Sequence, residues 1–428
     1  MSELSYLEKM LDGVEVEWRN LGDTSLFEIA NNGRKPVKAS LRIAGETPYY
    51  GANNIQDYVD GYTHDGEYVL IAEDGSASLE NYSIQYATGK FWANNHVHVV
   101  RGKERVHSRF LYHYLCIVNF LPFLTGGGRA KLTKGQLIEI PVPIPCPDNP
   151  EKSLAIQAEI VRILDKFTEL TAELTAELSM RKKQYNYYRD QLLSFDEEQE
   201  KPIYLEKLLD GVEVEWKMLG EVIHSLKTGL NPRQNFSLNT LDAQGYYVTV
   251  REIQNGKVVF LDKTDRVNDR ALKIINGRSN LEAGDILFSG TGTVGRIAVI
   301  EENPINWNIK EGVYTIKPIK EKIAPRFLSY LLQSSKIVKD YSKKIVGNPV
   351  ISLPMGDLKK LLIPIPCPGN PEKSLAIQSE IVRILDKFDT LTNSITEGLP
   401  REIELRQKQY EYYRDLLFSF PKPDSVTN

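Results

Sequence analysis

The sequence predicts an α+β protein in which two mixed α/β domains are separated by two long helices that form an antiparallel coiled coil. Three pairs of near-identical segments support this prediction. They are YLEKMLDGVEVEW (6–18) and YLEKLLDGVEVEW (204–216), NPEKSLAIQAEIVRILDKF (149–167) and NPEKSLAIQSEIVRILDKF (370–388), and RKKQYNYYRDQLLSF (181–195) and RQKQYEYYRDLLFSF (406–420). The segments between them barely resemble each other. We therefore expect one repeated frame, with pseudo-twofold symmetry, that carries two unlike inserts.

The duplication divides the chain into six segments. At 428 residues, 41% of them hydrophobic, the chain is long enough for several buried cores. The predicted segments are a leader (1–24), a first mixed α/β domain (25–148), a central helix (149–200), a second leader (201–222), a second mixed α/β domain (223–369) and a distal helix (370–428).

Both long helices have clear start signals and a narrow apolar stripe. In DNPE (148–151) and GNPE (369–372), Asn is the expected N-cap, Pro the first helical residue and Glu part of the first turn. Apolar residues then recur three and four positions apart, which is typical of a coiled-coil seam. A single helix over 153–195 would be about 65 Å long. The alternative is two ordinary amphipathic helices on separate cores. The main seam positions are Phe167, Leu174, Leu178, Tyr185, Phe388 and Tyr410.

The two helices differ in their middle parts. Phe167 and Tyr185 are 18 positions apart, whereas Phe388 and Tyr410 are 22 apart. The extra residues surround EGLPRE (397–402), where glycine and proline should kink or interrupt the distal helix. The central helix instead contains a tandem unit, TAELTAEL (171–178).

The two inserts have matching signals despite their different sequences. Strand composition and Gly turns occur at 66–75 and 284–300, and a helix is expected at 109–121 and at 325–341. Each insert then has a glycine-containing loop and ends in a proline-rich segment, PIPCP. We infer that the inserts are diverged versions of one fold.

Charge separates the inserts from the frame. The whole chain has a net charge of −4, but residues 25–140 carry +1, residues 223–360 carry +8, and the rest carries −13. The inserts are therefore suited to a polyanion, and the acidic frame is not. Three cysteines argue against a disulfide framework, and Cys146 and Cys367 read as one small buried residue copied twice. With no signal region and no apolar run long enough for a membrane span, the chain is expected in the cytoplasm.

Motifs for chemistry are missing. GTGTVG (290–295) fits a dinucleotide-binding pattern, but a further strand follows it, so a hairpin turn is expected. The chain has no GxxxxGK[ST] loop for ATP and no Asn/Asp-Pro-Pro-aromatic motif of amino-methyltransferases. His96 and His98 would share one face of a strand, as two metal ligands without a third or as part of a polar, half-buried face. We predict no catalytic residues and no metal site.

Basic loops supply the candidate binding residues. Lys and Arg can hold phosphates, and Arg, Asn and Gln can read base edges, so glycine-containing loops with these residues in both inserts favour DNA over a merely solvated surface. The candidates are Arg34, Lys35, Lys38, Arg42, Arg129, Lys131 and Lys134 in the first insert, and Lys227, Arg233, Gln234, Arg296, Lys343, Lys344 and Asn348 in the second.

Over essentially the whole chain, this pattern resembles the specificity subunit of type I restriction–modification systems, and most closely its C subfamily. The resemblance lies in the two leaders, the NPEKSLAIQ helix starts, the TAEL tandem and RKKQYNYYRDQLLSF. It implies that each insert is a target recognition domain for one half of a bipartite DNA sequence. It further implies that the helices separate these domains and dock two modification subunits, with seam residues such as Phe167, Tyr185, Phe388 and Tyr410 in that role.

The resemblance also places the cofactors on other chains. S-adenosylmethionine would be bound by the modification subunits, which methylate adenine at N6, and ATP and Mg²⁺ by the restriction subunits, so this chain would bind none. Two rival classes are open at this point. One is a self-contained methyltransferase or nuclease; the other is a coiled-coil scaffold, or another bivalent DNA-binding protein, without restriction partners.

Overall fold

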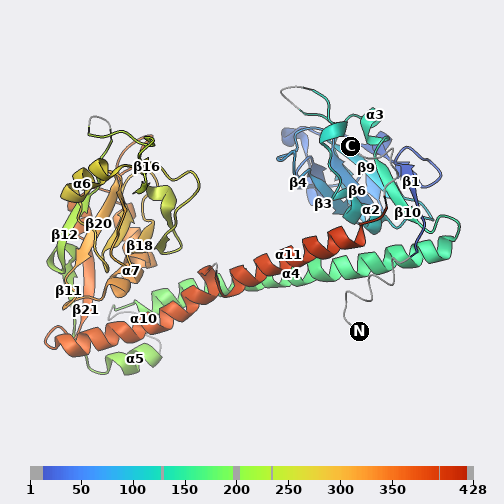
Figure 1. Cartoon of the computed structure of the whole chain (residues 1–428). Helices are drawn as coiled ribbons and strands as arrows, with labels where there is room; N and C mark the ends of the chain where they lie inside the picture. Colours follow the sequence, from blue (N-terminus) through green and yellow to red (C-terminus); the bar gives the residue numbers. More distant parts are fainter. Residues whose placement is uncertain (1–12, 127–129, 196–202, 233–234, 395, 422–428) are drawn as a thin grey trace. The chain divides into compact units, whose positions relative to one another are not determined.

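The computed structural model describes residues 13–126, 130–195, 203–232, 235–394 and 396–421 (Figure 1). The chain folds into two compact units, Met1–Glu173 with Glu404–Asn428, and Leu174–Ile403. Each unit contains one insert together with a part of each long helical segment. The compact units therefore differ from the domains predicted from the sequence, because each unit joins one insert to parts of both long helical segments.

Unit 1 contains two four-stranded sheets, in the orders β2-β9-β6-β7 and β4-β3-β8-β5, and the two-stranded pair β1-β10. Its strands are β1 (Val16–Asn20), β2 (Phe27–Ile29), β3 (Ala44–Gly51), β4 (Asn54–Val59), β5 (His64–Asp65), β6 (Tyr68–Ala72), β7 (Ile84–Ala87), β8 (Lys90–Ala93), β9 (Val97–Gly102) and β10 (Pro141–Pro145). Its short helices are η1 (Asn31–Gly33), η2 (Ala39–Leu41), α2 (Ser108–Leu115), η3 (Leu121–Phe123) and α3 (Lys134–Leu137).

Unit 2 contains a four-stranded sheet, β12-β20-β17-β18, a three-stranded sheet, β16-β13-β19, and the pairs β11-β21 and β14-β15. Its strands are β11 (Val214–Met218), β12 (Ile223–Thr228), β13 (Gly245–Val248), β14 (Ile253–Gln254), β15 (Lys257–Val258), β16 (Arg266–Val267), β17 (Ile286–Ser289), β18 (Ile297–Val299), β19 (Trp307–Ile309), β20 (Val313–Pro318) and β21 (Leu362–Pro366). Its short helices are α5 (Ile203–Leu209), η4 (Leu219–Glu221), η5 (Val250–Glu252), α6 (Asp269–Arg278), α7 (Pro325–Gln333), α8 (Ser335–Ser342) and α9 (Met355–Lys359).

The two inserts share one topology. The four-stranded sheet β2-β9-β6-β7 corresponds to β12-β20-β17-β18. In each of these sheets, the first strand in the sequence pairs with the last, and the two strands between them form a hairpin that completes the sheet. In each insert, a second sheet contains one parallel pair that ends near a tryptophan, with Tyr49 opposite Trp92 in β3–β8 and Tyr246 opposite Trp307 in β13–β19. The inserts are therefore diverged copies of one fold.

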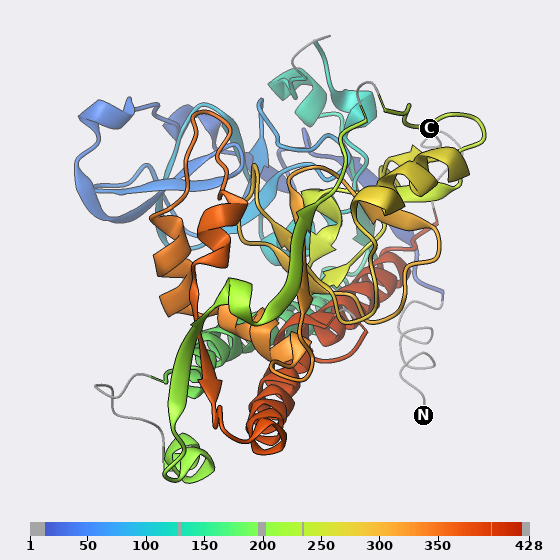
Figure 2. The ribbon, with the colours of Figure 1, turned by 90° about the vertical axis from the view of Figure 1, so that its left-hand side faces the viewer.

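Each leader forms a strand that pairs with the proline-rich exit of its own insert. Trp18 lies opposite Pro143 and Trp216 opposite Pro364, in the same antiparallel register; β11 and β21 lie side by side in Figure 2. Cys146 and Cys367 follow these exits with φ angles of 46° and 53°. Both are half-buried, so the prediction of a small buried residue is wrong. Their backbones instead turn the chain from strand to helix, where each amide donates to the leader.

The long helices begin as the sequence predicts. They are α4 (Pro150–Leu192), α10 (Pro371–Asn393) and α11 (Leu399–Leu417). The side chains of Asn149 and Asn370 accept from the third residue beyond them, each at 3.0 Å. The distal segment is interrupted between Asn393 and Leu399, where Gly398 has a φ of 79°. The predicted interruption is therefore confirmed.

The predicted helices of the inserts are shorter than expected. In place of 109–121, α2 ends at Leu115, because β-branched Ile117 and Val118 and then Asn119 disfavour its continuation. In place of one helix over 325–341, α7 and α8 are separated at Ser334, whose extended backbone ends the first helix and whose hydroxyl donates to Leu331 O at 2.7 Å.

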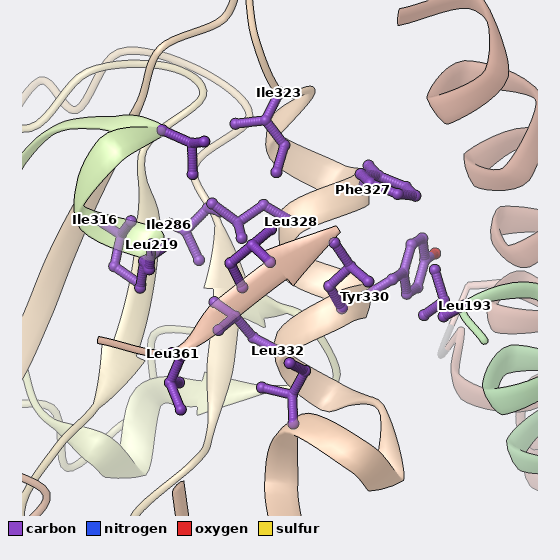
Figure 3. Packing of buried hydrophobic residues seen from close by; sticks show 14 of the residues in the cluster. Leu193, Leu219, Ile286, Ile316, Ile323, Phe327, Leu328, Tyr330, Leu332 and Leu361 are labelled. Atoms are coloured by element: carbon purple, nitrogen blue, oxygen red, sulfur yellow. The ribbon is translucent and has the colours of Figure 1, made fainter. Parts of the chain in front are cut away.

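Each unit has a main core in which its insert packs on the long helices. In unit 2, residues of α7 such as Phe327 and Leu328 meet strand residues such as Ile316 and the α4 end at Leu193 (Figure 3). In unit 1, Phe110 of α2 packs beside Phe418 after α11, with ring centroids 5.3 Å apart. No helix in the described part of the chain is long and apolar enough to cross a membrane.

Candidate nucleic-acid interface

Two loops at equivalent places in the inserts have the same backbone framework. Thr125 and Lys131 exchange backbone hydrogen bonds of 2.9 and 2.8 Å, and Val346 and Ser352 exchange bonds of 2.9 and 2.7 Å. We call residues 125–131 the first hairpin and residues 346–352 the second hairpin. Each is anchored by a further bridge to the chain after β6 or β17, Asp74 to Lys131 and Thr291 to Ser352. Both inserts thus close a seven-residue segment of different sequence with the same pair of backbone hydrogen bonds, and residues 127–129 of the first lie outside the described part of the chain.

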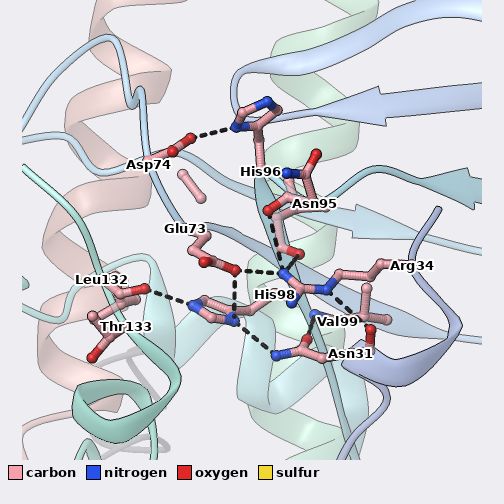
Figure 4. Close-up of polar contacts among 12 residues, drawn as sticks. Asn31, Arg34, Glu73, Asp74, Asn95, His96, His98, Val99, Leu132 and Thr133 are labelled. Atoms are coloured by element: carbon pink, nitrogen blue, oxygen red, sulfur yellow. Dashed lines mark hydrogen bonds and ion pairs between the residues drawn. The ribbon is translucent and has the colours of Figure 1, made fainter. Parts of the chain in front are cut away.

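The two basic segments of the first insert meet at Glu73, directly after β6, and Figure 4 shows the contact of Glu73 with Arg34. Arg34 Nη1 donates to Glu73 Oε2 at 2.5 Å, and Lys131 Nζ lies 2.9 Å from Oε1. Arg34 also donates to Val97 O at 2.9 Å. Burial alone would raise the pKa of Glu73, but the hydrogen bonds from Arg34 and Lys131 outweigh it and lower that pKa. Glu73 is therefore the charged centre that holds η1 and the first hairpin together.

A buried histidine completes this network. His98 Nε2 donates to Leu132 O at 2.7 Å, and its Nδ1 accepts from Asn31 Nδ2 at 2.9 Å. Burial lowers the pKa of His98, which agrees with this neutral tautomer. The expectation that His96 and His98 share a half-buried strand face is wrong. The strand β9 begins only at Val97, His98 is fully buried, and His96 lies outside it against Asp74 at 2.5 Å.

The second insert links its basic segments through backbone instead. Gly312 N donates to Thr228 Oγ1 at 3.0 Å, Gly290 N donates to Gly312 O at 2.8 Å, and Leu353 N donates to Gly290 O at 2.8 Å. This chain of bonds runs from β12 to the end of the second hairpin. Within that hairpin Gly347 has a φ of 105°, and an added Cβ would approach Val350 O to 2.2 Å, so only glycine fits.

The GTGTVG segment forms a hairpin turn, as predicted. It joins β17 to β18, which pair antiparallel, with Ile286 opposite Val299. Gly292 N donates to Ile351 O at 2.8 Å, so this turn supports the second hairpin. A dinucleotide site would need a helix after the turn.

The structure places the predicted binding residues in three groups. Two are used internally: Arg34 at Glu73, and Arg42, which pairs with Asp57 at 3.2 Å and lies 4.1 Å over the Tyr49 ring. The others that can be described lie at least partly exposed on their inserts: Lys35, Lys38, Lys131, Lys134, Lys227, Arg296, Lys343, Lys344 and Asn348. Arg129, Arg233 and Gln234 lie outside the described residues.

The frame docks each insert through a repeated glutamine. Gln157 of α4 accepts from His107 N at 2.8 Å and donates to Arg105 O at 3.1 Å. Gln378 of α10 does the same to Ala324 N and Lys322 O, at 2.8 and 3.1 Å. Both side chains are fully buried. The repeated SLAIQ segment therefore fixes the start of α2 and of α7 on a long helix.

A second repeated contact, which we call the domain–helix contact, holds the same short helices. In unit 1, Arg109 and His113 of α2 both bind Asp165 Oδ1 at 2.8 Å, and Tyr410 of α11 lies 3.3 Å from His113 Nδ1. In unit 2, Arg326 and Tyr330 of α7 bind Asp386 Oδ1 of α10 at 2.9 and 2.6 Å. Tyr185 of α4, the counterpart of Tyr410, belongs to the same buried cluster as Tyr330.

Glu73, Asn31 and the domain–helix contact were not predicted from the sequence. Glu73 and Asn31 had no sequence signal, because a buried polar network in one insert leaves no pattern in a single sequence. The domain–helix contact did have a sequence signal. Arg-Phe-Leu occurs in both inserts and Leu-Asp-Lys-Phe in both helices, at matching positions.

The described residues contain no group of three or more His, Cys, Asp or Glu side chains arranged to hold a metal ion. The geometry instead shows two loop-bearing inserts of one topology, each fastened to long helices by the same contacts. This arrangement defines a chain with two recognition modules on a duplicated helical frame.

Comparison with known proteins agrees with this class. The family model for the type I restriction modification DNA specificity domain matches the chain twice, at residues 14–180 and 212–405. A putative type I restriction enzyme specificity subunit of Haemophilus influenzae is 44% identical and covers 97% of this chain and 98% of its own length. A type I restriction enzyme specificity subunit of Escherichia coli is 37% identical over the full length of both. The chain belongs to the family of type I restriction–modification specificity subunits, whose function is sequence-specific DNA recognition.

Solved structures show the same fold at low sequence identity. The S subunit of a type I restriction–modification system from M. genitalium aligns with a TM-score of 0.56 at 17% identity, covering 96% of this chain and 98% of that one. A chain from a study of complex assembly and conformational transition of the type I R-M system aligns with a TM-score of 0.54 at 13% identity, covering 94% and 97%.

Proposed function

We propose that this chain reads an asymmetric, bipartite DNA sequence, one half-site with each insert, and docks two copies of a modification subunit on its duplicated frame. One observation carries the proposal. The contacts that fasten the inserts to the long helices recur at matching positions, at Gln157 and Gln378 and at Asp165 and Asp386, while the two hairpins differ in sequence. A duplicated surface suits two identical partners, and unlike loops suit two different half-sites.

The proposal includes an antiparallel, pseudo-twofold pairing of the long helices. Two aromatic contacts support it. Phe167, early in α4, stacks on Tyr413 of α11 with centroids 5.2 Å apart, and Phe388, early in α10, stacks on Tyr188, late in α4, at 5.5 Å. The partners are counterparts in the repeat, so the start of each segment meets the end of the other. The seam residues Leu174 and Leu178 are both half-buried. We assign them to the helix pairing that sets the spacing between the two inserts.

Catalysis and cofactors are assigned to the partners. We place S-adenosylmethionine on the modification subunits, and ATP and Mg²⁺ on restriction subunits, with this chain as the non-catalytic component. The inserts supply hairpins, basic side chains and buried polar networks that position them, which is what recognition requires. Since the complex must reach the host DNA, we place it in the cytoplasm. The C subfamily assignment stays a prediction.

Reconstitution tests the proposal. The purified chain with labelled S-adenosylmethionine and host DNA should transfer no methyl group, and the chain co-purified with its modification subunits should methylate adenine. Native mass spectrometry should give two modification subunits per copy of this chain. A fully active one-to-one complex would contradict the duplicated docking surface, and methyl transfer by the chain alone would contradict the non-catalytic role.

A further inference from the structure

The second insert has a basic surface that the first lacks. Helix α8 (Ser335–Ser342) buries Ile337 and Tyr341 in the core of unit 2. Lys336 and Lys339 are exposed, and Lys343 directly follows the helix. Positions three and seven apart share one face of a helix, so the three lysines point away from the buried side.

These lysines border two adjoining open hollows of about 440 and 590 Å³. Lys336, Asp340 and Lys343 line both hollows, and Trp216 and Leu362 form part of the wall of the larger one. Lys336 Nζ lies 4.0 Å above the centre of the Trp216 ring, within the range of a cation–π contact. We define the basic surface as Lys336, Lys339, Lys343, Lys344 and Lys360.

Few carboxylates balance this surface. Among the residues lining the two hollows, the acidic ones are Asp190 and Asp340. Asp190 accepts hydrogen bonds from the amide and hydroxyl of Ser335 at the start of α8, so it is used for capping. Asp340 lies 3.6 Å from Lys343, and Asp357, which does not line either hollow, lies 3.5 Å from Lys360. The surface therefore has a clear excess of positive charge, and like charges at this spacing repel each other instead of stabilising the helix.

The corresponding part of the first insert is uncharged. Between α2 and the first hairpin, residues 116–124 read CIVNFLPFL and contain no charged side chain. The equivalent stretch of the second insert, residues 333–345, reads QSSKIVKDYSKKI and is four residues longer. The basic surface is thus an addition to one module only, and the common fold does not require it.

We propose that the basic surface binds backbone phosphates of the DNA next to the half-site that the second hairpin reads. This inference rests on the proposed function. Continuity along the chain favours DNA over an acidic protein partner, because Lys343 and Lys344 lead from α8 directly into the second hairpin at Val346. Lysine is a flexible point charge that suits phosphates better than base edges, so the contact adds affinity without adding sequence information.

The test uses the complex with modification subunits and duplexes that contain its own recognition sequence. The variant Lys336→Gln/Lys339→Gln/Lys343→Gln removes three charges, and Lys336→Arg/Lys339→Arg/Lys343→Arg keeps them as a matched control. Each lost phosphate contact should weaken binding about fivefold at 0.15 M salt and reduce the slope of log K against log salt by about 0.9. The Gln variant should therefore bind about 100-fold more weakly, to specific and non-specific duplexes alike, and the Arg variant should bind normally.

Shortening the duplex locates the contact. Removing base pairs that flank the second half-site should weaken the wild-type complex and leave the Gln variant unchanged, whereas trimming beside the first half-site should not distinguish them. An unchanged salt slope in the Gln variant would overturn the inference. So would a loss of modification subunits from the complex, which would identify the surface as a protein docking site. If the methylated sequence in cells shows no bipartite site at all, the proposed function fails instead.

Discussion

Because of Glu73, the basic residues of the first insert cannot be ranked as DNA contacts by their charge alone. Arg34 and Lys131 both bind its carboxylate, but Arg34 is mostly covered, with 18% of its side chain exposed, whereas Lys131 is 46% exposed. Arg34 therefore positions η1 and the first hairpin. Lys131 lies at the surface, where it can share its charge between Glu73 and a phosphate.

Alanine substitutions of the basic candidate residues in each insert should separate the effects on the two half-sites. Changing Arg129 and Lys131 should weaken contacts to the first half-site, and changing Arg233, Lys343 and Lys344 should weaken the second. A lost phosphate contact should lower the salt slope by about 0.9, and a lost base contact should cost about 1–3 kcal/mol and relax one position.

Binding of the complex to duplexes altered in one half-site at a time measures both effects. Lys152→Ala, an exposed lysine in the first turn of α4, is the control and should change neither. Unchanged affinity and salt dependence with all five positions replaced would show that these loops do not contact DNA.

His113 should make the stability of the chain depend on pH. Burial, only partly opposed by the Asp165 hydrogen bond, lowers its pKa from 6.5 to about 4. The unfolded histidine takes up a proton between these values and the folded one does not, so the free energy of unfolding should fall as pH drops from 6.5 to 4. The full effect is on the order of 3 kcal/mol.

The second unit suggests a control variant for His113. Tyr330 occupies the equivalent position and donates to Asp386 at 2.6 Å, so His113→Tyr should keep a hydrogen bond to Asp165 without the titration. Urea unfolding followed by tryptophan fluorescence should show a smaller loss of stability at low pH in His113→Tyr than in the wild type. Parallel pH profiles would mean that His113 does not control this dependence.

At the level of elements, the frame could be predicted from sequence and the inserts only in part. Asn149 and Asn370 cap their helices, and the distal segment is interrupted before Leu399, close to the predicted position, because capping and backbone restriction are local effects. The ends of α2 and α7 were missed although their signals are local, with β-branched Ile117 and Val118 after α2 and Ser334 at the end of α7. The Glu73 network was missed because residues 31, 73, 98 and 131 meet only in the folded sheet.

The length of the TAEL tandem in α4 should set the distance between the two half-sites on DNA. Deleting Thr175–Leu178 removes about 6 Å of helix and rotates the remainder by about 40°, a small change of phase for the apolar stripe. Leu174 and Leu178 are equivalent and both half-buried, so the seam can re-form. DNA rises about 3.4 Å per base pair, so the spacer between the half-sites should shorten by one or two base pairs.

Mapping methylated adenines in cells that carry the deletion measures the spacer directly. The half-site bases should stay the same, since neither insert is altered. A spacer of unchanged length, or changed bases within a half-site, would show that α4 does not set the distance.

At the scale of the whole molecule, duplication separates assembly from specificity. The frame repeats its contacts to both inserts, and each insert has its own sheets, core and hairpin within one compact unit. Charge follows the same division, since the inserts carry +1 and +8 and the rest of the chain −13. One module can therefore change its loops without disturbing the other module or the repeated frame.

Exchange of one insert tests this central claim most directly. Residues 25–140 would be replaced by the matching segment of another family member, keeping Gln157 and Asp165 of the frame, and the adenine methylation of the host genome would be read by long-read sequencing. We predict a new first half-site, with the second half-site and the spacer unchanged. A change in both half-sites would contradict two independent readers on one repeated frame.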